Sequence, residues 1–143
     1  VKIIGDPTAF DQDIQDKIRK LEEFSKDYDE LYFQIALNYG SRDEITRGMR
    51  KLAQDAADGR LNPQEITEDT ISGYLDTAGV PDPDLLIRTS GEQRLSNFLM
   101  WQLAYTEFYF TDVAWPDFHK EDLIRAIEKY NGRDRRYGGV KEE

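Results

Sequence analysis

The sequence predicts an α/β fold in which a mostly parallel sheet is flanked by helices, and two observations support this prediction. Short apolar segments alternate along the chain with longer segments whose apolar residues recur at helical spacing, which is the pattern of β-α-β units. Each short apolar segment is followed by glycine or polar residues, as is typical of the carboxyl ends of parallel strands, where ligands of this fold class bind.

Three segments are predicted to be strands: 1–4, 31–37 and 84–87. The second and third are near-continuous apolar runs, so we expect both faces of these strands to be buried. The segments that follow the strands are Gly5-Asp6, Asn38–Arg42 and Arg88–Glu92. Because the carboxyl ends of parallel strands lie at the same side of a sheet, we expect these segments to form one functional edge.

Helices are predicted where apolar residues recur every three to four positions. The predicted helices are 10–26, 43–57, a helix beginning at Thr67, 97–104 and 121–130. Gly59 is expected to end the second helix. Glu68 and Asp69 suit the first turn of the third helix, because acidic residues stabilise the positive end of the helix dipole. Ser96 is a predicted cap of the fourth helix.

Composition excludes several classes of function. The formal net charge of -10 argues against a nucleic-acid-binding surface, because such domains are usually basic. The chain has no cysteine and one histidine, His119, which excludes disulfides, thiolate metal sites and multi-histidine metal sites within one chain. No apolar run reaches the length of roughly 18 residues that a transmembrane helix needs. These features are compatible with a cytoplasmic enzyme.

Arg88 is the sharpest candidate for chemistry. It directly follows the apolar residues of a predicted buried strand, where an isolated charge would cost several kcal/mol, so its guanidinium must be paired or must line a cleft. With Arg94, the amides of the turn and a helix N-terminus, it would form a diphosphate cradle. The alternative is that Arg88 pairs with Glu92 or Asp84 and only holds the loop.

Glu107 is the second candidate, because it lies in the strongly aromatic stretch 98–110. A carboxylate in such surroundings is neutralised, paired with arginine or bound to a metal, and the alternative is a glutamate at a helix end facing solvent. We interpret the aromatic stretch as core or subunit interface, with a hydrophobic ligand pocket as the alternative. The chain contains no Walker loop, G-x-G-x-x-G or G-x-S-x-G motif.

Three segments resemble the cis-prenyltransferase family of the undecaprenyl diphosphate synthase type. They are DLLIRTSGEQRLSNFLMWQLAYTEFYFTDVAWPDF at 84–118, IALNYGSRDEI at 35–45 and RDRRYGG at 133–139. The resemblance implies condensation of isopentenyl diphosphate onto farnesyl diphosphate, with undecaprenyl diphosphate as the product for the cell-wall lipid carrier. By position in the motif, five residues are expected to bind substrate: Arg88, Glu92, Arg94, Leu95 and Ser96.

The resemblance also implies a cofactor and a partner. Glu107 matches a glutamate associated with Mg²⁺, and Arg136 and Gly138 match a tail that reaches the subunit interface of a homodimer. The expected location is the cytoplasm, with at most peripheral membrane contact through the lipid product and no nucleic-acid partner.

One family motif, the D-G-N-G-R-W loop with the catalytic aspartate, does not occur in residues 1–143. Because Val1 already begins a predicted strand, we expect residues 1–143 to be the C-terminal part of a single domain, with the catalytic aspartate upstream. Such a chain would be inactive in isolation. The alternatives are a trimmed terminus, a non-catalytic partner subunit and a diphosphate-binding or dimerisation module.

Overall fold

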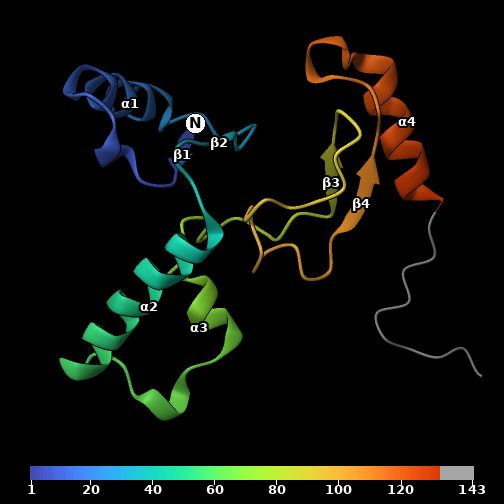
Figure 1. Cartoon of the computed structure of the whole chain (residues 1–143). Helices are drawn as coiled ribbons and strands as arrows, with labels where there is room; N and C mark the ends of the chain where they lie inside the picture. Colours follow the sequence, from blue (N-terminus) through green and yellow to red (C-terminus); the bar gives the residue numbers. More distant parts are fainter. Residues whose placement is uncertain (133–143) are drawn as a thin grey trace, which may run out of the picture. The chain divides into compact units, whose positions relative to one another are not determined.

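The computed structural model describes residues 1–132, and the chain divides into two compact units, Val1–Pro81 and Asp82–Glu143. We call them the N-terminal unit and the C-terminal unit. Each contains one parallel pair of strands together with helices (Figure 1). The predicted α/β class with parallel pairing is therefore confirmed in both units.

The N-terminal unit begins with a β-α-β arrangement. Strand β1 (Lys2–Ile4) leads into helix α1 (Gln12–Ser25), and strand β2 (Gln34–Ala36) returns parallel to β1, with Ile3 opposite Ile35. The parallel order follows from the helical crossover, because a short turn could join only antiparallel strands.

Two further helices, α2 (Ser41–Ala57) and α3 (Glu68–Ser72), complete the N-terminal unit and contact each other. Both confirm predicted helices, and their ends follow the predicted local chemistry. Gly59 lies just after α2 with a φ of 72°, and Thr67 caps α3 through its hydroxyl, which accepts a hydrogen bond from the Thr70 amide at 3.2 Å.

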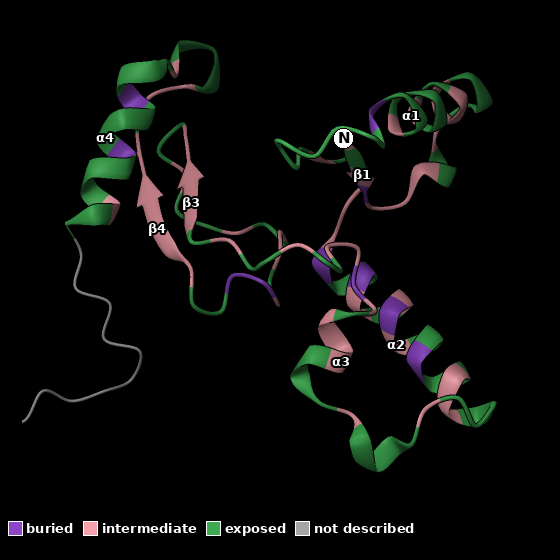
Figure 2. Cartoon of the chain, turned by 180° about the vertical axis from the view of Figure 1, so that it is seen from behind, coloured by how far each residue is buried: buried purple, intermediate pink, exposed green. Residues whose placement is uncertain are grey.

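The prediction of a strand buried over 31–37 is only partly confirmed, since β2 is confined to Gln34–Ala36. The preceding large side chains are exposed, at 77% for Leu31, 75% for Tyr32 and 54% for Phe33. Their apolar character is typical of a buried strand, but within the described N-terminal unit these three side chains are exposed. Figure 2 shows this segment among the exposed residues, whereas buried positions follow one side of α2.

The C-terminal unit contains strands β3 (Leu85–Arg88) and β4 (Glu107–Phe110), paired in parallel, and helix α4 (Lys120–Asn131), which contacts β4. Strand β3 confirms the predicted third strand, although its residues are half-buried rather than buried. Helix α4 confirms the last predicted helix. Strand β4 was not predicted, because its aromatic sequence suits a helix or a strand equally well.

The predicted helix at 97–104 is wrong. This segment forms a series of turns, with backbone φ values of 49° at Ser96, 64° at Asn97 and 43° at Leu99. These left-handed conformations break the repeat of negative φ angles that an α-helix requires. Ser96 therefore caps no helix, and the aromatic stretch crosses from turns into β4.

Candidate functional site

A pocket lies at the carboxyl end of β3 and brings together three of the five predicted substrate residues. It encloses about 280 Å³ and its lining includes Leu86, Ile87, Arg88, Arg94, Leu95 and Phe98. Two arginines thus border a hollow whose other lining residues are apolar. This combination suits a small ligand with an anionic head and a short hydrocarbon tail.

The turn after β3 is held by backbone hydrogen bonds to the segment after β4. The amide of Ser90 donates to the Val113 carbonyl and the amide of Gly91 donates to the Thr111 carbonyl, both at 2.9 Å. Gly91 has a φ of 69°, which glycine adopts without strain. Because these amides already have acceptors, the expectation that they cradle a diphosphate is wrong for these two groups.

The two arginines of the pocket differ in their partners. Arg94 forms an ion pair with Glu92, and its side chain is 65% exposed. Arg88 forms no ion pair with any residue of 1–132. The alternative in which Arg88 pairs with Glu92 or Asp84 is therefore wrong. An anion in the pocket would meet the Arg88 guanidinium directly but would compete with Glu92 for Arg94. Ser96 is exposed and lies outside the pocket lining.

Glu107 lies at the opposite end of the strand pair. It is opposite Leu85 at the start of the ladder, whereas Arg88 is opposite Phe110 at its end. At about 3.3 Å per residue, Glu107 and Arg88 are separated by about 10 Å along the strands. The fold of this unit therefore does not place Glu107 beside the two arginines.

The residues within 1–132 do not by themselves form a magnesium site. No cluster of three or more carboxylate or histidine side chains in this range could hold a metal ion. Mg²⁺ is commonly held by one or two carboxylates with substrate phosphates and water, so Glu107 would supply only one of its ligands. Arg136 and Gly138, the predicted interface residues, lie outside the described residues.

The N-terminal unit brings the carboxyl ends of β1 and β2 together, as predicted. The amide of Asp6 donates to the Asn38 carbonyl at 3.3 Å, and the Asn38 side-chain amide donates to the Asp6 carbonyl at 3.0 Å. Around these turns lies a set of ion pairs and hydrogen bonds that sequence analysis missed, formed by Glu44, Arg47 and Asp76. Charged residues are mostly exposed in proteins, so the sequence gives no signal that these three come together, and only the structure identifies them.

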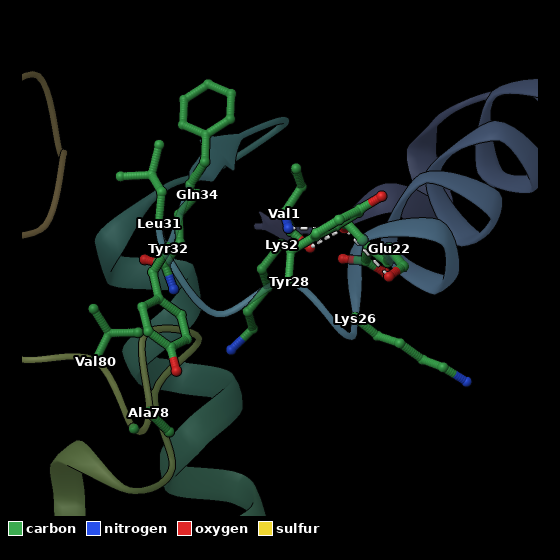
Figure 3. Close-up of a pocket in the computed structure, with 13 residues that line it drawn as sticks. Val1, Lys2, Glu22, Lys26, Tyr28, Leu31, Tyr32, Gln34, Ala78 and Val80 are labelled. Carbon is green, nitrogen blue, oxygen red and sulfur yellow. Dashed lines mark hydrogen bonds between the residues drawn. The ribbon is translucent and has the colours of Figure 1, made fainter.

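A second cavity, of about 450 Å³, lies in the N-terminal unit (Figure 3). Tyr32, Leu31 and Val80 line it, together with the stem of Lys2 and the start of the chain, where the Val1 amine donates to Ser25 Oγ at 2.8 Å. The ammonium group of Lys26, which also lines the cavity, already pairs with Glu23. None of the predicted site residues lines this cavity.

The chain matches a family model described as "Putative undecaprenyl diphosphate synthase" over residues 1–138. The chain belongs to this prenyltransferase family. Among curated relatives, the isoprenyl transferase of Agrobacterium fabrum is 51% identical over 143 residues, which is 100% of this chain and 58% of the relative. That of Chlamydia trachomatis is 49% identical over 138 residues, covering 96% of this chain and 54% of the relative.

Solved prenyltransferase structures are also similar. Lavandulyl diphosphate synthase from Lavandula x intermedia, in complex with dimethylallyl diphosphate, has a TM-score of 0.91 and 42% identity, covering 96% of this chain and 59% of that one. A probable undecaprenyl diphosphate synthase from Campylobacter jejuni has a TM-score of 0.82 and 34% identity, covering 96% and 62%. The chain thus spans little more than half the length of the prenyltransferases that it matches. No helix within residues 1–132 is long and apolar enough to cross a membrane.

Proposed function

We propose that residues 1–143 carry the isopentenyl diphosphate site of a cis-prenyltransferase and form the C-terminal part of its single domain. The observation that carries this proposal is the pocket at the end of β3, where Arg88 and Arg94 border an apolar hollow. The guanidinium groups would bind the diphosphate, and Leu95 and Phe98 would contact the five-carbon chain. Dimethylallyl diphosphate, bound by the lavandulyl diphosphate synthase, belongs to the same chemical class.

In the proposed reaction, the enzyme condenses isopentenyl diphosphate onto farnesyl diphosphate and forms undecaprenyl diphosphate in the cytoplasm. Arginines placed on phosphate oxygens stabilise negative charge and orient the substrate, which are the main protein contributions to such transfers. Mg²⁺ is also part of the proposal, with Glu107 supplying one carboxylate at the end of the strand pair away from Arg88. A homodimer with Arg136 and Gly138 at its interface is part of the same proposal.

Titration calorimetry of the full chain with isopentenyl diphosphate, with and without Mg²⁺, tests the proposed site. We expect saturable binding that Arg88→Ala weakens roughly 10- to 100-fold, because a charge-assisted hydrogen bond contributes about 1.5–3 kcal/mol. Arg125→Ala is the control for removal of an arginine outside the pocket, since Arg125 is 65% exposed and pairs with Asp122. Equal weakening by both substitutions, or no saturable binding, would contradict the proposal.

A further inference from the structure

Asp76 joins two segments of the N-terminal unit that are far apart in sequence. Its Oδ2 accepts a hydrogen bond from the Gly5 amide at 2.9 Å, directly after β1. The same carboxylate is held by both terminal nitrogens of Arg47 in α2, at 2.9 and 2.7 Å. The Asp76 side chain is 17% exposed, so these contacts are largely shielded from water. Such bidentate pairing fixes the orientation of both side chains.

Glu44 extends this set of contacts to the end of β2. It is 1% exposed, and its Oε1 accepts a hydrogen bond from the backbone amide of Asp76 at 2.8 Å. Its Oε2 accepts a hydrogen bond from the hydroxyl of Tyr39, in the turn that follows β2. A buried carboxylate is retained only where hydrogen bonds replace its hydration, and here they come from two separate segments.

The two turns tied in this way lie against each other at the carboxyl edge of the β1–β2 pair. Gly5 has a φ of 107°, and a Cβ at this position would lie 2.2 Å from the Leu37 carbonyl oxygen. The backbones therefore approach too closely for any side chain at Gly5. Ligands of open α/β sheets bind at this edge, so the geometry of the turns decides which groups face a ligand.

We propose that Asp76 is a positioning residue that, with Arg47 and Glu44, holds the Gly5-Asp6 and Asn38–Gly40 turns in a single geometry. Burial alone would raise the pKa of Asp76, but hydrogen bonds from Arg47 and Gly5 and the charges of Arg47 and Lys2 lower it below the ordinary aspartate value. The carboxylate is therefore ionised at neutral pH and available to both donors. The identity of the ligand at this edge rests on the proposed function, whereas the positioning role does not.

Amide hydrogen exchange, measured by nuclear magnetic resonance on the full chain, tests this role without any ligand. In Asp76→Asn, we expect the Gly5 amide to exchange on the order of ten to a hundred times faster, because it loses a charged acceptor. The amide resonances of Asn38 and Tyr39 should shift as well. Arg47→Lys, which keeps the charge but not the bidentate geometry, should give a smaller change and serves if Asp76→Asn does not fold.

Asp55→Asn is the matched control, because Asp55 is likewise held by an arginine, Arg60 at 2.9 Å, and by the hydroxyl of Tyr74 at 2.6 Å. It should leave the Gly5 amide unchanged. Unchanged exchange at Gly5 in Asp76→Asn, or equal acceleration in both variants, would overturn the inference. Failure of the proposed function is seen separately, as the absence of shifts near Gly91 when isopentenyl diphosphate is added to the unsubstituted chain.

Discussion

Arg88 and Arg94 carry the same charge, but their surroundings give them different roles in binding. Arg94 is already neutralised in part by Glu92, so an incoming anion gains less from it. No such partner of Arg88 is found among the described residues, and Arg88 is the last residue of β3. Arg88 is therefore expected to contribute more to anion binding.

We predict that Arg88→Ala weakens binding of isopentenyl diphosphate more than Arg94→Ala does. The physical reason is that removal of Arg94 also removes its competing contact with Glu92. The two dissociation constants, compared by calorimetry at one ionic strength, check this order, with Arg125→Ala as the unaffected reference. A larger loss for Arg94→Ala would show that its pairing with Glu92 does not persist in the bound state.

Gly5 is predicted to be the glycine of the N-terminal unit least tolerant of substitution. Gly5→Ala should destabilise this unit by roughly 1–3 kcal/mol or more, because its Cβ would meet the Leu37 carbonyl in addition to the backbone strain. Gly59→Ala is the control: it shares a positive φ, of 72°, but has no atom within 4 Å of the added Cβ. Urea unfolding measures the free energy of unfolding of both variants. An equal loss of stability in the two would mean that the close contact at Gly5 relaxes.

Helix α3 is short and depends on its cap rather than on length. Thr67 and Thr70 form reciprocal hydrogen bonds between side chain and backbone at 3.2 Å. Thr67→Ala should lower the free energy of unfolding by about 1 kcal/mol, whereas Thr67→Ser, which keeps the hydroxyl, should change it little. Urea unfolding again provides the measurement, and an equal loss in both variants would contradict the capping role.

Local chemistry explains which elements the sequence predicts correctly. Helices α2 and α4 follow from apolar spacing, and α3 follows from the capping threonine, because these signals act within a few residues. The strand β4 depends on its pairing with β3, which is distant in sequence. Likewise, the apolar spacing that identifies α2 does not mark Glu44 as buried, because that depends on Tyr39 and Asp76.

The candidate site, like the fold, is predicted from the sequence only in part. The motif predicts that Arg88, Arg94 and Leu95 lie together, and the pocket contains all three. It also associates Glu107 with Mg²⁺, but the register of β3 and β4 places that residue at the other end of the ladder from Arg88. The sequence does not reveal this separation, because register depends on how the two strands pair.

The part of the chain that the structure describes, residues 1–132, buries few apolar side chains for its length. They are Ile4, Leu52, Leu75, Leu103 and Ala126 within the described residues. Polar contacts such as that of Arg47 with Asp76 therefore contribute a larger share of the stability than they would in a domain with a large core. The stability of the N-terminal unit should consequently depend on pH.

The pKa of Asp76 is lower in the folded chain than in an unfolded one, where it is about 3.9. The resulting stabilisation is complete above that value and is lost as the pH falls through the lower, folded-state pKa. We predict that stability against urea declines below about pH 4 and that Asp76→Asn makes this decline shallower. Urea unfolding followed by circular dichroism between pH 7 and pH 3 measures this decline in stability. If stability declines equally steeply in Asp76→Asn, groups other than Asp76 cause the acid sensitivity.

A crystal structure of the chain with isopentenyl diphosphate is the most direct test of the proposed site. We predict diphosphate oxygens at about 2.7–2.9 Å from the guanidinium nitrogens of Arg88 and Arg94, with the hydrocarbon against Leu95 and Phe98. A diphosphate bound elsewhere on the chain, or a pocket that stays empty at saturating ligand, would contradict the assignment of this pocket.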